Sequence, residues 1–239
     1  MKEKYTILYQ DDYIIAVDKP SGLLSIKDRE ENTVNLFDIV KKDFEDLRLI
    51  HRLDRDTSGL ILFAKNIEGQ REFSKLFETH DIIKKYSALV VGCPNMEGGT
   101  IENCLEENPN LKGTYRVARS NKGKKAISVY SVLEKFKKHS LVEFDIKTGR
   151  THQIRVHALY IGCPLAFDPL YNSKSGILVS DLKPKYKETS QEEQSIIRRL
   201  SLHSHSLEFF HPFLNQNTKI TCTYPRDINK SLEILRKYT

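Results

Sequence analysis

The stretch that decides the fold is LIHRLDRDTSGLILFAK, residues 49–65. A charged cluster runs from His51 to Thr57, and apolar β-formers follow at once in residues 60–63. This pattern predicts a loop that leads into a buried strand. Asp54 lies between Arg52 and Arg55 along the chain. Because neighbouring cations keep a carboxylate ionised, Asp54 is a candidate nucleophile, although a turn-capping role would also explain it.

The pattern on either side of this stretch predicts short strands with few helices. Residues 5–17 predict a hairpin, since two apolar runs flank a polar turn. Helices are expected over residues 32–44, capped by Asn32 or Thr33, over 68–80 and over 151–162. Most of the chain between residues 84 and 149 predicts strands, which favours antiparallel pairing. The polar stretch 173–195 predicts a surface excursion.

These elements predict an α+β fold with a central, mostly antiparallel mixed sheet and flanking helices. We expect one domain over residues 1–239, because there is no convincing linker and no internal repeat.

The charge of the chain points to an anionic partner. The formal net charge is +6. Residues 112–138 hold nine lysines and arginines against Glu134 alone, so this segment carries 9 − 1 = +8. Such a run is either a solvated face or a flexible hairpin that contacts phosphates. The basic members are Lys112, Arg116, Arg119, Lys122, Lys124, Lys125, Lys135, Lys137 and Lys138.

Several classes of protein find no support in the sequence. There is no signal peptide and no apolar run of about 18 residues, so we expect a cytoplasmic protein without a membrane span. The four cysteines form no framework, and the histidines lack the spacing of a metal motif. Neither a P-loop nor the GxGxxG or GxSxG motif is present.

A second arginine-rich stretch changes the interpretation of Asp54. TGRTHQIRVHALYIG, residues 148–162, brings Arg150 and Arg155 close together about 100 residues downstream. Two such segments suggest one site assembled from both. HRLDRDTSGLILFAK and GRTHQIRVHALYIGCPLAFDPLY resemble the two signature stretches of the RluA-type pseudouridine synthases. Three further stretches match in order: ILYQDDYIIAVDKPSGL, KKYSALVVG and RLSLHSHSLEFFHP.

The resemblance implies the pseudouridine synthase catalytic fold and a role for five residues. Asp54 would be the catalytic aspartate, and Tyr86 would stack on the flipped-out uridine. Arg155 would pair with the aspartate, Leu202 would line the base pocket, and Arg52 would help to turn the uridine out of the RNA. The implied reaction is an isomerisation that needs no metal and no cofactor. Attack on the sugar and abstraction of a sugar proton both remain open for Asp54.

The implied partner is structured RNA, with ribosomal RNA slightly favoured over transfer RNA, and a monomer is expected. An N-terminal S4 domain, common in relatives, is not expected, because the matching motifs begin at Tyr5. Cys163 and Phe167 replace the His and Gly common in the family, which affects local packing more than catalysis. An RNA-binding protein or chaperone with lost catalysis is the alternative. A glycosidase using Asp54 and Asp56 fails, since carboxylates two residues apart do not flank one bond.

Overall fold

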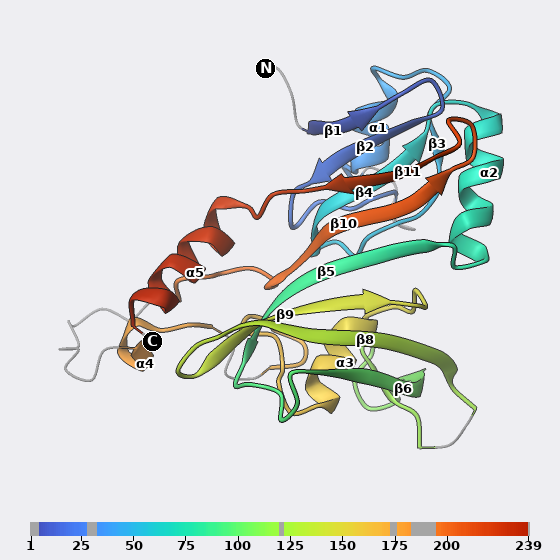
Figure 1. The fold of residues 1–239 in the computed structure, drawn as a ribbon. Helices are drawn as coiled ribbons and strands as arrows, with labels where there is room; N and C mark the ends of the chain where they lie inside the picture. Colours follow the sequence, from blue (N-terminus) through green and yellow to red (C-terminus); the bar gives the residue numbers. More distant parts are fainter. Residues whose placement is uncertain (1–4, 28–32, 120–121, 173–175, 183–194, 239) are drawn as a thin grey trace. The chain divides into compact units, whose positions relative to one another are not determined.

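The computed structural model describes residues 5–27, 33–119, 122–172, 176–182 and 195–238. The chain forms two compact units, and Figure 1 labels most of their elements. The first unit comprises Met1–Tyr86 and His203–Thr223, and the second comprises Ser87–Leu202 and Tyr224–Thr239. That all 239 residues form one domain stays a prediction.

The first unit is built around a mixed sheet in the order β1-β2-β4-β10, with β3 paired to β4 and β11 to β10. The β4–β10 pair is parallel, whereas the other pairs with a defined register are antiparallel. The elements are β1 Thr6–Gln10, β2 Ile14–Lys19, α1 Leu36–Lys41, β3 Arg48–Leu49, β4 Ser58–Ala64, α2 Ile67–Glu78, β10 Leu202–His211 and β11 Gln216–Thr221. β5, Ile82–Val91, begins in this unit and ends in the second, and Leu202, the first residue of β10, belongs to the second unit.

Strand β4 is the centre of the first unit, as the apolar run after the charged loop predicted. All seven of its residues are buried, which is typical of a strand covered on both faces. Gly59 has a φ of +106°, and a Cβ there would lie 2.3 Å from the carbonyl oxygen of Ser204 on the parallel neighbour. Only glycine allows β10 to approach the start of β4 so closely.

Two helices accompany this sheet. α2 packs against β3 and β4 (Figure 1). Its N-cap is Asn66, whose side chain accepts a hydrogen bond from the backbone N–H of Gly69. Phe73 of α2 is fully buried among the core residues Leu62 and Leu207. The expected helix over residues 68–80 is therefore confirmed.

The helix expected over residues 32–44 was predicted too long, with the wrong cap. α1 begins at Leu36, and its cap is Asn35, which accepts from the backbone N–H of Asp38. The physical reason lies upstream: the backbone N–H groups of Leu36 and Phe37 donate to the carbonyls of residues 24 and 25. These contacts hold Asn35 in an extended conformation, so the helix cannot start earlier. Asn32 lies outside the described residues.

The second unit holds the sheet order β5-β9-β8-β6-β7. The pairs β6–β7, β6–β8 and β8–β9 are antiparallel, which confirms the predicted predominance of antiparallel pairing. Helix α3 packs against β7 and β8. The elements are β6 Gly98–Glu107, β7 Tyr115–Val117, β8 Lys124–Lys135, β9 His139–Ile146, α3 Gln153–Tyr160, α4 Val179–Leu182 and α5 Arg226–Lys237.

The core of the second unit includes a segment that the sequence placed on the surface. Ile177 and Leu182 are buried in the cluster that also contains Leu89, Ile228 and Leu232. The prediction of a surface excursion over 173–195 is thus wrong for this part, because apolar side chains within the polar stretch complete a core. Residues 173–175 and 183–194 lie outside the described residues. Among the described helices, none has the length and apolarity to cross a lipid bilayer.

Candidate active site

The backbone of the loop that carries Asp54 is held by the last residue of β2 and by the residues that follow it. The carbonyl of Arg55 accepts from Lys19 Nζ at 2.7 Å and from the backbone N–H of Gly22 at 3.0 Å. The carbonyl of Asp56 accepts from Ser21 Oγ at 2.6 Å. These contacts fix the chain immediately after Asp54.

Lys19 is the least expected member of this arrangement. Its side chain is fully buried, and its ammonium also donates to the carbonyls of Pro20 and Leu23, at 3.0 and 2.7 Å. Carbonyl acceptors offset part of the cost of burying the charge. The sequence analysis did not single out Lys19. The available signal was the lysine at the end of the mostly apolar strand YIIAVDK.

The residue before Asp54 is held as well. Leu53 exchanges two hydrogen bonds with Ser25 Oγ: its N–H donates at 3.0 Å and its carbonyl accepts at 2.7 Å. The carbonyl of Asp54 accepts from the N–H of Thr57 at 3.2 Å, which closes a turn. The backbone on both sides of Asp54 is therefore fixed, as a catalytic carboxylate requires.

His51 serves as scaffolding for the loop, one of the roles considered for it from the sequence. Its Nε2 accepts from the backbone N–H of Leu62 at 3.0 Å, and its ring stacks on Phe77 with centroids 4.4 Å apart. Desolvation and the nearby Lys84 cation lower the pKa of His51 to about 3. The imidazole is therefore neutral at physiological pH.

Asp54 lines a cavity of about 180 Å³, and the other charged residues in the described part of its lining are cations. Lys27, Arg52 and Arg55 share this lining with Asp54. Both arginines are exposed and Asp54 is half-buried. Three cations around one carboxylate attract a phosphate backbone while leaving the carboxylate available for chemistry.

The structure brings Tyr86 into the electrostatic reach of Asp54 within the first unit. Tyr86 is 8% exposed and hydrogen-bonds the side chain of Ser204. Burial raises the pKa of Tyr86, and the charge of Asp54 raises it further. The phenol therefore stays protonated at neutral pH and offers an aromatic face and a hydroxyl, but no base.

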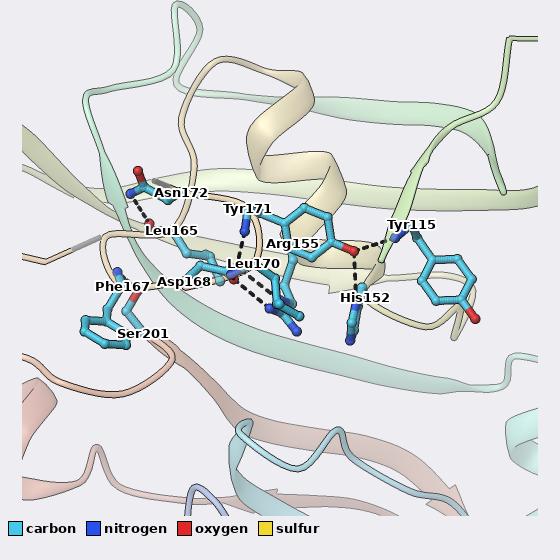
Figure 2. A network of polar contacts seen from close by, with 10 residues as sticks. All are labelled: Tyr115, His152, Arg155, Leu165, Phe167, Asp168, Leu170, Tyr171, Asn172 and Ser201. Carbon is cyan, nitrogen blue, oxygen red and sulfur yellow. Dashed lines mark hydrogen bonds and ion pairs between the residues drawn. The ribbon is translucent and has the colours of Figure 1, made fainter. Parts of the chain in front are cut away.

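Within its own unit Arg155 pairs with Asp168, and its pairing with Asp54 stays a prediction. Figure 2 shows its guanidinium facing Asp168: Nε donates to Oδ2 at 2.8 Å and Nη2 to Oδ1 at 2.6 Å. Both side chains are buried, at 4% and 0% exposure. The sequence analysis missed Asp168, although it lies in the quoted stretch AFDPLY. Its signal was a carboxylate enclosed by apolar residues.

Leu202, at the start of β10, is buried. Arg155 and Leu202 both belong to the second unit, whereas Asp54, Arg52 and Tyr86 belong to the first. The meeting of all five residues at one site stays a prediction.

A hydrogen-bonded network surrounds the Arg155–Asp168 pair. Asp168 Oδ1 also accepts from the backbone N–H groups of Leu170 and Tyr171, at 3.0 and 3.2 Å. The guanidinium carbon of Arg155 lies 4.8 Å from the centroid of the Tyr171 ring. The Tyr171 hydroxyl accepts from the backbone N–H of Tyr115 at 2.7 Å and lies 2.8 Å from His152 Nδ1 (Figure 2). The network therefore ties β7 to the start of α3.

Helix α3 itself begins later than expected. It starts at Gln153, because His152 adopts a left-handed conformation with a φ of 56°. Arg150 lies before the helix, where its Nε donates to the carbonyl of Lys125. Helix α3 ends at Tyr160, and Gly162, with a φ of +76°, follows its cap. Within the described residues, no group of three or more His, Cys, Asp or Glu side chains is arranged to hold a metal ion.

Comparison with known proteins identifies the family to which this chain belongs. The family described as RNA pseudouridylate synthase matches residues 13–160. The chain belongs to this family, whose members are isomerases that act on RNA.

Individual relatives match almost the whole chain. The Ribosomal large subunit pseudouridine synthase D of Xanthomonas campestris is 30% identical over 97% of this chain and 69% of its own length. The enzyme of the same name from Buchnera aphidicola is 34% identical over 96% of this chain and 73% of its own. Among solved structures, human RNA Pseudouridylate Synthase Domain Containing 4 aligns with a TM-score of 0.75 and 28% identity, covering 96% of this chain and 92% of that one. The predicted fold is thereby confirmed.

Proposed function

We propose that this RNA pseudouridine synthase uses Asp54 as its catalytic carboxylate. The observation that carries the proposal is the position of Asp54: a backbone-clamped loop presents it to a cavity it shares with three cations, within electrostatic reach of the buried Tyr86.

The reaction asks for one carboxylate and no cofactor. The C1′–N1 bond of uridine breaks, a C1′–C5 bond forms, C5 loses its proton and N1 gains one, so atoms balance without an oxidant. An ionised aspartate can serve either by attacking the sugar or by removing a sugar proton.

The remaining predicted residues fit roles around an extruded base. A uridine stacked in RNA cannot present C1′ and C5 to a side chain, so it must be turned out and held. We assign Tyr86 to stacking on the base and Leu202 to the apolar wall of the base pocket. The exposed Arg52 is assigned to the extrusion of the uridine, and Arg155 to pairing with Asp54. Asp168 would keep the guanidinium of Arg155 in place.

The names of the relatives support ribosomal RNA as the substrate. Both enzymes quoted above are called ribosomal large subunit pseudouridine synthases, and we extend that substrate class to this chain in preference to transfer RNA. We further propose a cytoplasmic monomer whose 239 residues act as one catalytic domain without a cofactor.

The test is a comparison of two carboxylates in one loop. Asp54→Asn should abolish pseudouridine formation and leave RNA binding and folding intact, because the residue serves chemistry rather than packing. Asp56→Asn, which changes the neighbouring exposed carboxylate, is the matched control and should retain activity. Activity is read by carbodiimide mapping of ribosomal RNA from a strain that lacks the gene and carries each variant.

Three outcomes are informative. A site that appears with wild type and Asp56→Asn, but not with Asp54→Asn, supports the assignment and names the uridine. If Asp54→Asn keeps a tenth of the activity, Asp54 is not the catalytic group. If no site in any ribosomal RNA depends on the gene, the ribosomal substrate is wrong, and an RNA-binding role without catalysis becomes the better explanation.

A further inference from the structure

We propose that the second unit carries a nucleotide-binding subsite of its own, for an unpaired base of the RNA and its flanking phosphates. The base enters an apolar pocket beside α3, and the phosphates lie over an adjoining basic pocket. The inference rests on RNA being the substrate, and it is independent of the role of Asp54.

The apolar pocket has a volume of about 360 Å³ and an open rim of large side chains. Four of them are exposed to an unusual degree for their type: Tyr160 by 62%, Leu111 by 51%, Leu170 by 46% and Leu159 by 43%. Isolated exposed leucines need no explanation, but a group that lines one concave surface marks a binding site.

The inner wall of this pocket is held in place before any ligand arrives. Tyr115 and Tyr171 both line it. The Tyr171 hydroxyl accepts from the backbone N–H of Tyr115 and contacts His152 Nδ1 (Figure 2). The His152 ring in turn meets both tyrosine rings edge-on, at 5.7 and 5.6 Å between centroids. A fixed aromatic wall lowers the entropic cost of binding a flat ring.

A second pocket of about 370 Å³ adjoins the first, since Tyr115 lines both. Lys122, Lys124 and Arg150 contribute three cations to its lining. Two carboxylates are present as well, Glu106 and Glu107. This pocket therefore carries a net positive charge.

Glu106 is largely neutralised by a residue of the apolar pocket. Arg116 lines that pocket, and its Nη2 lies 2.7 Å from Glu106 Oε1 while its Nε donates to the same oxygen. Across the two linings there are four cations against two carboxylates. The excess of positive charge suits a polyanion.

An apolar pocket beside a basic pocket indicates which kind of ligand binds here. An aromatic and aliphatic pocket next to a cationic one matches a nucleotide, whose base stacks on aromatic faces while its phosphates need cations. A second protein or another copy of this chain would account for the apolar rim, but it would not account for the basic pocket that Tyr115 also lines.

The experiment measures RNA affinity with two rim variants and one control. Tyr160→Ala and Leu170→Ser each remove an exposed side chain from the pocket, so the fold should persist, and thermal unfolding checks that it does. Phe210→Ala is the control, because Phe210 is 53% exposed on β10 of the first unit and lines neither pocket. The probe is a 12-nucleotide oligouridine, with a double-stranded RNA of the same length beside it.

We expect Tyr160→Ala to weaken oligouridine binding about tenfold, the loss of one stacking contact. Leu170→Ser should weaken it severalfold, and Phe210→Ala should change it less than twofold. The salt slope should stay unchanged in all three variants, because no phosphate contact is removed. The duplex, whose bases are stacked, should bind wild type and variants alike. Photo-cross-linking of 5-iodouridine should label Tyr115 or Tyr160.

Unchanged oligouridine affinity in both rim variants would overturn the subsite. So would a wild-type dimer, seen by analytical ultracentrifugation, that the rim variants convert to monomer, because the apolar face would then bind another copy. Repeating the measurement with Asp54→Asn separates the two proposals. Activity retained in Asp54→Asn contradicts the catalytic assignment alone, and oligouridine affinity that ignores the rim contradicts the subsite alone.

Discussion

Removing the carboxylate of Asp168 should strongly destabilise the protein. Asp168 is fully buried and accepts two hydrogen bonds from the nearly buried guanidinium of Arg155. In Asp168→Ala the guanidinium stays behind as an uncompensated buried charge, which typically costs about 3–5 kcal/mol. The backbone N–H groups of Leu170 and Tyr171 lose an acceptor as well. For a chain of this size, the melting temperature should fall by roughly 10 °C.

The chain offers a matched control in the same unit. Asp227 accepts two hydrogen bonds from Arg199, at 2.6 and 2.8 Å, but its side chain is 40% exposed. Because water can solvate the arginine once the carboxylate is gone, Asp227→Ala should cost only about 1 kcal/mol. The two pairs share their geometry and differ in burial, so the comparison isolates the effect of desolvation.

Urea unfolding followed by circular dichroism measures both variants, and a double mutant completes the cycle. Arg155→Met combined with Asp168→Ala removes both charges, so the loss should be smaller than the sum of the single losses by about 2 kcal/mol. Equal costs for Asp168→Ala and Asp227→Ala, or strict additivity in the cycle, would refute the reasoning that a buried charge is left unpaired.

Three further predictions concern other parts of the chain. Lys19→Met should lower the free energy of unfolding by roughly 3 kcal/mol in urea titrations, since three carbonyls lose a buried donor. An unchanged free energy of unfolding would mean that Lys19 does not stabilise the loop of Asp54. Burial lowers the pKa of His157 to about 4, so the unfolded chain binds more protons below pH 6.5. The contribution of His157 to the free energy of unfolding should be fully present above pH 6.5 and decline towards pH 4. His157→Gln should reduce this pH dependence, and the remainder belongs to His51, whose pKa is also lowered; an unchanged dependence in His157→Gln would contradict the assignment. Neutralising Lys122, Lys124 and Lys125 should reduce the slope of log affinity for RNA against log salt concentration by about 2. An unchanged slope would mean that these three lysines do not contact RNA phosphates.

The sequence predicted an element correctly where the pattern that specifies it lies within the element itself. The two apolar runs of the hairpin at residues 5–17 and the apolar run of β4 are local patterns, and all three strands formed as predicted. The start of α1 was predicted wrongly, because its cap depends on contacts with residues 24 and 25, which no helical pattern encodes. Ile177 and Leu182 were misplaced for the same reason: their burial depends on elements far away in the chain.

The sequence by itself determined the family, the mostly antiparallel α+β fold and Asp54 as the candidate nucleophile, since ordered motifs and periodicity are properties of the chain alone. Only the tertiary structure decided that Lys19 clamps the loop of Asp54, that Asp168 pairs with Arg155, and that Tyr171 fixes Tyr115 beside an apolar pocket. The physical reason is that a buried charge or hydroxyl needs a partner nearby in space, and the chain can supply that partner from any distance along the sequence.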